Sequence, residues 1–299
     1  MSIILSGIKY LCYHGWLNWL PDKPYIKLLY YASFSHKLDL DNPRSYNEKL
    51  QWLKLNERNE QYSIMVDKVA VRSYIKDRIG EEYLIPSIGV WNSEEEIQFD
   101  SLPEQFVLKC NHNSGKGMCI CKNKKELDFD YVKKQLRKGL KEKYYLIGRE
   151  WPYRMVHPKI LGERFMVDES GDELKDYKVM CFEGEPKLIE LHMGRFTNHQ
   201  TQDFYDTNWE KTSISQGNDK DYGMSDIKIP KPECLDEMLQ LSRKLAEGIH
   251  HIRVDWYVIN GKLYFGELTL FDGSGFVAYD DPQNDLLLGS WIELPIDKS

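Results

Sequence analysis

The segment from Arg253 to Thr269 constrains this chain most, because it predicts a β-hairpin that is charged on one face. Apolar residues alternate with Arg253 and Asp255 in its first half, and Asn260-Gly261 is a preferred two-residue hairpin turn. The apolar positions are Val254, Trp256 and Val258. Since successive side chains of a strand point to opposite faces, Arg253 and Asp255 share the face opposite the predicted core. A charged pair in an apolar strand costs on the order of several kcal/mol unless it is compensated, and a bound cation and a phosphate would compensate both charges.

The register of this hairpin decides whether Glu267, in its second half, can act together with Asp255. A strict two-residue turn pairs Asp255 with Gly266 and sends Glu267 to the opposite face. Carboxylates are hard oxygen ligands that suit a magnesium ion shared with nucleotide phosphates, and Thr269 adds a weaker oxygen. A metal site therefore requires a bulge or an odd-length loop in the hairpin.

The same hairpin has a simpler interpretation that needs no ligand. Arg253 can form a surface ion pair with Glu267 on an edge hairpin. Lys262 can do the same with Asp255. Such pairs are common and stabilise little, and the hairpin alone supports both interpretations equally.

Strands predicted over 106–110 and 118–121 flank a loop of small and polar residues. Backbone N–H groups of such a loop can approach phosphate oxygens, and Lys109 on the first strand adds a fixed positive charge. The loop residues are Ser114, Gly115, Lys116 and Gly117. The loop lacks the G-x4-G-K-[ST] pattern and joins strand to strand, which excludes a Walker loop and a dinucleotide-binding fingerprint. An ordinary glycine hairpin is the alternative.

The order of the predicted elements is that of an α+β protein. Three regions are predicted, namely a helical region over 1–60, a region over 61–158 with the glycine-rich loop, and a region over 159–299 with the hairpin. Ser45 and Glu48 form a capping box at a helix start, and a helix over 63–79 carries Lys68 in its first turns. Strands are predicted over 159–167, 177–182 and 187–192, and helices within 122–143 and over 233–248.

Two further basic residues, Lys178 and Arg195, are predicted on or beside strands. If their sheet faces the cleft of the hairpin carboxylates, Lys178 neutralises the β- and γ-phosphates and Arg195 receives an anionic substrate. His112 in the glycine-rich loop is a candidate general base, although a loop histidine is more often a hydrogen-bonded bystander.

The composition limits the classes of molecule that the protein is expected to bind. A net charge of −7 argues against nucleic acid, whose binding relies on surplus lysine and arginine. No run approaches the roughly 20 apolar residues of a membrane span, and the six cysteines are predicted to be reduced thiols of a cytoplasmic protein. The aromatic segment over 1–20 predicts a helix that packs on the core, and the alternative is a helix that docks on a membrane surface or a partner.

Taken in order, these segments resemble the ATP-grasp superfamily and, within it, the TupA-like subgroup associated with teichuronopeptide and capsular polysaccharide biosynthesis. The motifs that carry the resemblance are Ser45–Trp52, Asp67-Lys68, Phe106–Lys109 with its glycine-rich loop, Asp176-Tyr177-Lys178, Arg253–Tyr257 and Phe265–Thr269. The resemblance implies a fold in which two α+β lobes hold ATP between antiparallel sheets.

The resemblance also implies roles for single residues. Lys68 and Lys109 contact ATP, the loop from Ser114 to Gly117 closes over the phosphates, and Glu163 lies at the adenine-binding hinge. Lys178 and Arg253 match phosphate-side positions, and Asp255 and Glu267 match the carboxylates that hold two magnesium ions. Thr269 stands where similar proteins often have asparagine, which puts the coordination of the second ion in doubt.

Similar enzymes transfer a phosphoryl group from ATP to a carboxylate, and an amine then displaces phosphate to form an amide. The resemblance therefore implies a carbon–nitrogen ligase that acts on a small-molecule or saccharide carboxylate, such as a uronic acid of a bacterial surface polysaccharide. It would act in the cytoplasm or at the inner face of the membrane. The alternatives are a sugar kinase, a non-catalytic nucleotide-binding module, and a glycosyltransferase built on the Asp39-x-Asp41 or Asp128-x-Asp130 pairs.

Overall fold

The computed structural model describes residues 3–168, 174–194, 200–216 and 223–296. The α-helices are α1 (Ile3–Tyr13), α2 (Asp22–Phe34), α3 (Tyr46–Asn56), α4 (Gln61–Val66), α5 (Val71–Arg78), α6 (Phe129–Leu140), α7 (Tyr145–Gly148), α8 (Leu235–Ala246) and α9 (Pro282–Ser290). The strands are β1 (Ser87–Trp91), β2 (Phe106–Cys110), β3 (Cys119–Cys121), β4 (Ile160–Arg164), β5 (Asp176–Phe182), β6 (Glu185–Met193), β7 (Thr201–Tyr205), β8 (His251–Ile259) and β9 (Lys262–Thr269). Among the short 3-10 helices, η6 (Asp272–Gly275) lies directly after β9.

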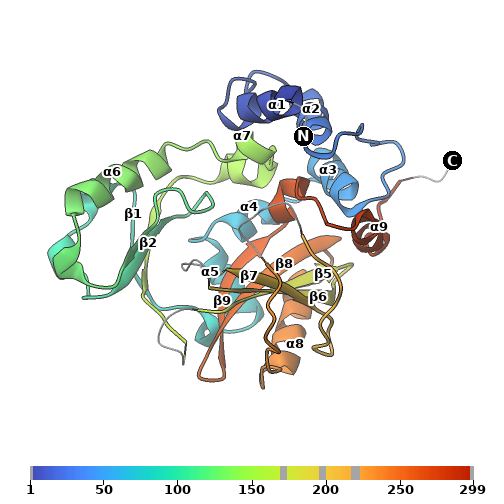
Figure 1. The fold of residues 1–299 in the computed structure, drawn as a ribbon. Helices are drawn as coiled ribbons and strands as arrows, with labels where there is room; N and C mark the ends of the chain where they lie inside the picture. The colour runs from blue at the N-terminus through green and yellow to red at the C-terminus, as the bar shows by residue number, and fades with distance from the viewer. Residues whose placement is uncertain (1–2, 169–173, 195–199, 217–222, 297–299) are drawn as a thin grey trace.

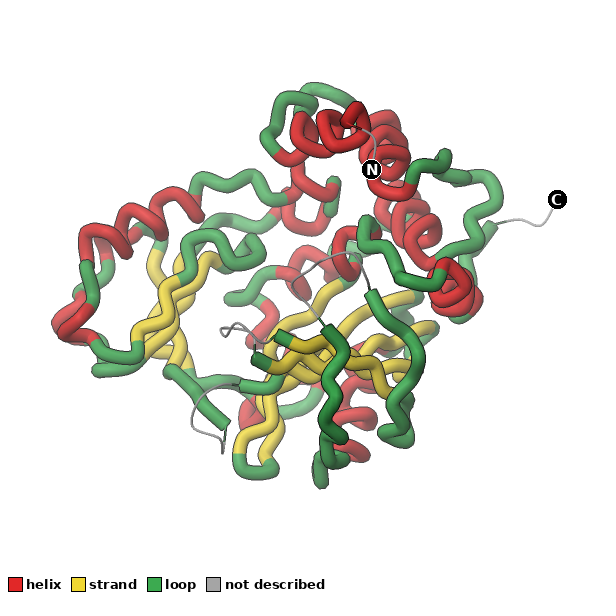
Figure 2. Tube along the Cα trace, viewed as in Figure 1, coloured by secondary structure: helices red, strands yellow, loops and turns green. Residues whose placement is uncertain are grey.

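The strands form two antiparallel sheets, which confirms the predicted α+β class. The first has the order β1-β4-β2-β3 and the second the order β7-β6-β5-β8-β9. Figures 1 and 2 show the sheets as separate layers, with α6 over the first and α8 beneath the second. β4 lies in the region predicted over 159–299 but pairs with β1 and β2, so the division into three regions remains a prediction.

The largest apolar core lies where α8 packs against β5, β6 and β8. Val254 and Trp256 are fully buried there, which confirms the predicted core face of the hairpin. The indole Nε1 of Trp256 donates a hydrogen bond of 2.9 Å to Ser242 Oγ on α8. This packing leaves the opposite face of β8, with Arg253 and Asp255, directed away from the core.

The N-terminal helices form a separate layer that is bound to the C-terminal part of the chain. The predicted capping box is present, because Ser45 accepts from the backbone N–H of Glu48 and Glu48 accepts from that of Ser45. From α3, Gln51 donates to the carbonyl oxygen of Gly275 at 2.6 Å, and Lys54 donates to that of Ser274 at 2.8 Å. The helical layer thus holds η6 in place beside the end of β9.

α1 packs on α2 through a third apolar cluster that includes Cys12, Tyr25 and Leu29. The six cysteines are free. Of the helices in the described ranges, none has the length and apolar character needed to cross a bilayer.

The helix predicted over 63–79 is interrupted, and this prediction was wrong in one respect. α4 ends at Val66 and α5 begins at Val71, with Lys68 in the break between them. Asp67 Oδ1 accepts from the backbone N–H of Val69 at 2.8 Å, and the N–H of Lys68 donates to the carbonyl oxygen of Asn111. These bonds replace helical ones and tie Lys68 to the end of β2.

Candidate functional site

The hairpin of β8 and β9 contains the bulge that a shared site requires. Asn260 and Gly261 form a two-residue turn with φ of 51° and 75°, and Ile259 pairs with Lys262. The register then shifts, because Trp256 pairs with Phe265 whereas Val254 pairs with Leu268. Two residues therefore oppose Asp255, and the second of them is Glu267.

This bulge places Glu267 and Thr269 on the same face as Arg253 and Asp255. Gly266 makes the bulge sterically accessible, since a Cβ atom there would lie 3.0 Å from the backbone oxygen of Asp255 and 3.3 Å from its Cβ atom. The register problem posed by the sequence is thus resolved by one extra residue in β9.

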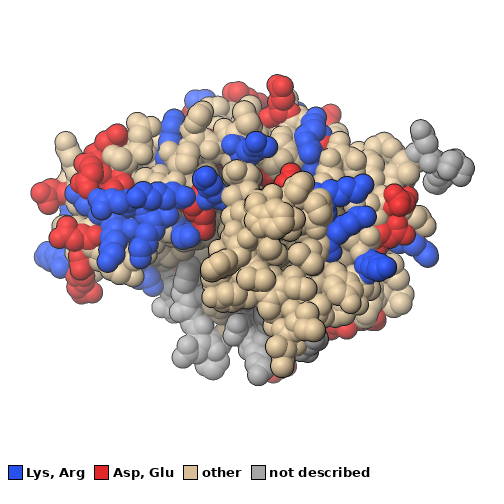
Figure 3. All heavy atoms as spheres, turned by 90° about the horizontal axis from the view of Figure 1, so that it is seen from above, with Lys and Arg blue, Asp and Glu red and all other residues tan. Residues whose placement is uncertain are grey.

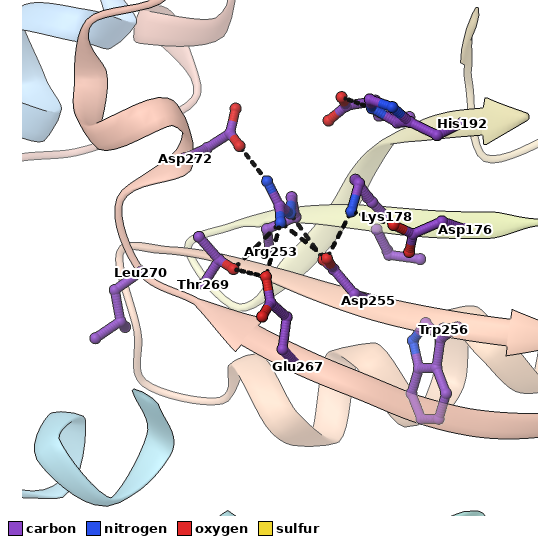
Figure 4. A network of polar contacts seen from close by, with 12 residues as sticks. Asp176, Lys178, His192, Arg253, Asp255, Trp256, Glu267, Thr269, Leu270 and Asp272 are labelled. Carbon is purple, nitrogen blue, oxygen red and sulfur yellow. Dashed lines mark hydrogen bonds and ion pairs between the residues drawn. The ribbon is translucent and has the colours of Figure 1, made fainter. Parts of the chain in front are cut away.

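Arg253 is the centre of a buried network of opposite charges (Figure 4). Its Nε and Nη2 atoms donate to the two oxygens of Asp255 at 2.7 and 2.8 Å. Its Nη1 atom donates to Asp272 of η6, and its Nη2 atom lies 3.3 Å from Glu267 Oε1. Burial lowers the pKa of Arg253, but Asp255 and Asp272 outweigh it and hold this pKa well above the usual value.

Lys178 on β5 is the second buried cation of the network. Its Nζ atom donates to Asp255 at 2.8 Å and to Asp176 at 2.6 Å (Figure 4). Residues 178 and 255 are direct partners in the pairing of β5 with β8, which explains the short contact. Burial lowers the pKa of Lys178, but the two aspartates raise it above its usual value, so this lysine stays charged.

Glu267 is the most exposed carboxylate of this network, with 38% of its side chain accessible. Its burial raises the pKa, yet Lys68 and then Arg253 lower it more, so the pKa is well below the usual range and the carboxylate is ionised at neutral pH. Asp255 differs, because burial raises its pKa more than Arg253 and Lys178 lower it.

Lys68 connects the hairpin with the glycine-rich loop. Its Nζ atom donates to the carbonyl oxygen of Asn113 at 2.9 Å and lies 3.5 Å from Glu267 Oε2. The break between α4 and α5 therefore places Lys68 between the β8–β9 hairpin and the glycine-rich loop. These are the two elements that the sequence predicted to bind phosphate.

Lys109 and Glu163 lie on adjacent strands of the four-stranded sheet, where they bind each other. Lys109 Nζ is 2.6 Å from Glu163 Oε2, and Arg72 Nη1 is 3.2 Å from Glu163 Oε1. Lys109 also contributes to the low pKa of Glu267, so its charge acts on the hairpin as well.

The glycine-rich loop is anchored at one end and open at its tip. Gly117 has a φ of 75° and lies against α6, where an added Cβ atom would be 2.9 Å from the Cα atom of Gly139. Gly115 has a φ of 83° with no atom within 4 Å of an added Cβ, and Lys116 pairs with Glu142 at 3.1 Å. His112 is buried and hydrogen-bonds through Nε2 to the carbonyl oxygen of Glu142, as expected for a bystander.

A cavity of about 430 Å³ joins these elements. Lys68, Ser114, Arg253, Glu267 and Thr269 line one part of it. The remaining wall comes from α1, α7, η6 and the strands β6 and β7, and includes Tyr13, Tyr144, Glu150, Glu190, His192, Gln202 and Asp272.

Glu190 is a buried carboxylate of this wall. Its Oε1 atom accepts from Gln202 at 2.6 Å and contacts His192 Nε2, whereas Oε2 has no hydrogen-bond partner in the described ranges. Burial raises its pKa, but His192 and Arg253 lower it to about 2. The Glu190 carboxylate is therefore ionised at neutral pH.

Most of the predicted site residues lie at or directly behind this cavity, namely Lys68, Ser114, Lys178, Arg253, Asp255, Glu267 and Thr269. Lys109 and Glu163 lie on the other sheet. Arg195 is outside the described residues. Sequence reasoning missed Asp176, Glu190, His192 and Asp272. Glu190 and His192 alternate within the strand predicted over 187–192, and Asp176 directly precedes the strand predicted over 177–182, so the period of two that singled out Arg253 and Asp255 was available for them. Asp272 follows β9 and had no such signal.

Glu267 and Thr269 line the cavity and carry oxygens of the kind that bind magnesium, and Glu267 also contacts Lys68 and Arg253 there. Both Asp255 oxygens accept hydrogen bonds, and only 3% of its side chain is exposed, so it would join a metal only after Arg253 or Lys178 moves. Within the described ranges, no group of three His, Cys, Asp or Glu side chains has metal-binding geometry.

A family model described as TupA-like ATPgrasp matches residues 48–293, which include both sheets. None of the curated proteins matches the sequence. Solved structures of similar fold include the D-alanine–D-alanine ligase from Helicobacter pylori, with 17% identity and a TM-score of 0.45 over 85% of this chain and 70% of that one.

Two further structures have TM-scores of 0.40. The D-alanine–D-alanine ligase from Bacillus anthracis complexed with ATP is 15% identical, over 69% of this chain and 54% of the ligase. A RimK domain protein ATP-grasp from Sphaerobacter thermophilus DSM 20745 is 9% identical, over 77% of this chain and 66% of that protein. At such low identity and TM-score, the likeness says nothing of substrate or activity.

Proposed function

This chain belongs to the TupA-like ATP-grasp family, and on that basis we propose that it is an ATP-dependent ligase that joins a carboxylate to an amine. The family confirms the predicted ATP-grasp fold. The proposed reaction has two steps. A carboxylate oxygen attacks the γ-phosphorus of ATP and ADP leaves, and an amine then attacks the acyl carbon and phosphate leaves.

The observation that carries the proposal is the convergence of three cations and an ionised carboxylate on one cavity. Lys68 and Arg253 line it, and Lys178 lies directly behind it on β5. Phosphoryl transfer needs positioning and neutralisation of charge more than a covalent nucleophile, and this set of residues supplies both. In this proposal Lys109 and the loop from Ser114 to Gly117 also bind the phosphates.

We propose that Glu267 and Thr269 hold magnesium, which neutralises charge on the phosphates when it is bound. The low pKa of Glu267 supports this role, because an ionised carboxylate is available for the ion at neutral pH. Asp255 keeps Arg253 oriented through its two hydrogen bonds and is the second candidate ligand. The number of ions and the adenine contact of Glu163 are further parts of the proposal.

The acceptor is proposed to occupy the part of the cavity between η6 and β6. The fixed charge of Glu190 favours a cationic or hydrogen-bond-donating group there, such as the amine. The proposed carboxylate substrate is a uronic acid of a bacterial surface polysaccharide, a role supported by the family resemblance. Arg195, which lies outside the described residues, is proposed to receive that carboxylate.

The Asp pairs that motivated a glycosyltransferase have local structural roles. Asp39 accepts from the backbone N–H groups of Asp41 and Asn42, and Asp128 caps α6 by accepting from the N–H of Tyr131. Neither pair lines the cavity. A sugar kinase and a non-catalytic nucleotide-binding module, each with the same nucleotide site, are therefore the alternatives that need an experimental test.

The test uses hydroxylamine, which converts an acylphosphate into a hydroxamate. The protein is incubated with ATP, magnesium and single uronic acids or amino acids, and both ADP and hydroxamate are measured. A ligase gives hydroxamate and ADP in equal amounts, and Glu267→Gln gives neither. A phosphorylated hydroxyl product without hydroxamate would identify a kinase and refute the proposal.

A further inference from the structure

Helix α1 is mostly apolar, with Ser6 and Lys9 as polar interruptions, and among the described residues it packs on α2 with one side. Ile8 and Cys12 face α2 in the third apolar cluster. On the outward side Ile3 is 91% exposed, and Tyr10 and Leu11 are exposed as well. Large apolar side chains that are grouped and exposed in this way are typical of an interaction surface, so the outward face of α1 has that character.

The exposed apolar surface continues into the turn after α1. Trp16 is 69% and Trp19 76% exposed. We call the exposed residues Ile3, Tyr10, Leu11, Tyr13, Trp16 and Trp19 the aromatic patch. Tryptophan and tyrosine have an apolar ring and a polar N–H or O–H group, and they are enriched where membrane and water meet.

The segment that contains α1 and α2 carries more lysine than acidic residues, whereas the chain as a whole is acidic. Residues 3–38 contain four lysines and one aspartate, which is a net charge of +3 in a chain whose net charge is −7. Lys23 and Lys27 on α2 are exposed close to Trp19 in the sequence. In the view from above, lysine and arginine side chains gather over α6 with acidic side chains beside them (Figure 3), and Lys134 and Lys138 of α6 are exposed.

We propose that this side of the protein docks on a membrane surface that carries anionic lipid headgroups, with the aromatic patch in the interface and the lysines toward the headgroups. Basic residues next to exposed aromatic ones complement such a surface in both charge and polarity. With 11 residues, α1 is about 16 Å long, roughly half the hydrocarbon thickness of a bilayer, so it lies along the surface.

The aromatic patch is continuous with the cavity. Tyr13 is 49% exposed and also lines the cavity, together with residues of α7 and η6. Docking therefore brings the cavity close to the bilayer surface. This placement follows from the surface alone and does not depend on the ligase activity.

The experiment measures sedimentation of the full chain with vesicles of phosphatidylcholine, with and without about one third phosphatidylglycerol. We expect at least tenfold stronger binding to the anionic vesicles, weakened by added salt. The double variant Trp16→Ala with Trp19→Ala should bind these vesicles at least tenfold more weakly. The double variant Lys23→Glu with Lys27→Glu should lose the preference for anionic vesicles, and it changes only exposed lysines, so it remains informative if the tryptophan variant fails to fold.

The matched controls change exposed residues elsewhere on the chain. They are Met224→Ala with Ile227→Ala for apolar area, and Lys228→Glu with Lys262→Glu for charge. Both should bind as the wild type does. Equal binding to neutral and anionic vesicles, or equal losses in the controls, would overturn the proposal. A tryptophan-dependent dimer in sedimentation velocity without vesicle binding would overturn it as well, because the occupant of the patch would then be a second copy.

Discussion

Gly266→Ala tests whether the bulge in β9 positions the nucleotide site. An alanine Cβ atom would lie 3.0 Å from the backbone oxygen of Asp255, 3.3 Å from its Cβ atom and 3.3 Å from Tyr257 Cε2. Ordinary contacts of this kind begin near 3.4 Å, so the two strands must separate by a few tenths of an ångström. Such overpacking costs about 1–3 kcal/mol of unfolding free energy. It also moves Asp255 relative to Glu267, and a misplacement of about 1 Å can reduce turnover about 100-fold.

Gly261→Ala is the matched control in the same hairpin. Gly261 has a φ of 75°, and no atom lies within 4 Å of an added Cβ. An alanine in this backbone conformation costs about 1–2 kcal/mol, similar to the cost at Gly266, but it leaves the bulge unchanged.

Thermal unfolding would compare the stability of the two variants, and calorimetry with ATP, in the presence and absence of magnesium, would compare their sites. We expect both to unfold a few degrees below the wild type. In the presence of magnesium, only Gly266→Ala should bind ATP at least tenfold more weakly than the wild type. Equal ATP binding by the two variants would refute the role of the bulge, since the control shares the loss of stability but not the change in register.

Three more predictions concern single side chains. Lys109→Ala should weaken ATP binding by about tenfold or more in calorimetry, because the proposed phosphate site loses a positive charge, whereas Lys109→Arg should retain most of the affinity. Glu267→Gln should remain folded but abolish ATP turnover, and wild-type turnover would contradict the magnesium assignment. The pKa of Glu190 is lowered to about 2 in the folded state, so its stabilising contribution is present above about pH 4.5 and is lost as pH falls toward 2. The difference in urea midpoint between wild type and Glu190→Gln should therefore shrink between pH 5 and pH 3, and a constant difference would contradict the low pKa.

The sequence alone determined much of the local structure around the site. Alternation of apolar and charged residues correctly predicted that Val254 and Trp256 are buried. The turn at Asn260-Gly261 and the capping box at Ser45 were also predicted correctly. These features depend on residues a few positions apart, whose backbone preferences and hydrogen bonds act within one element.

Only the tertiary structure decided how these elements meet. Asp67 and Asn111 interrupt a helix so that Lys68 reaches Glu267, a contact between residues far apart in the sequence. Glu190 and Asp272 join the network from β6 and η6, and the packing of those elements on β5 and β9 brings them there. From the sequence, the bulge could only be stated as a requirement for a metal site. The alternation of side chains shows which residues of a strand share a face, but it does not show where the pairing of two strands shifts. The register shift between β8 and β9 depends on two tertiary contacts. One face of the hairpin is buried against α8, and the charged side chains of the other face form ion pairs with residues from other elements.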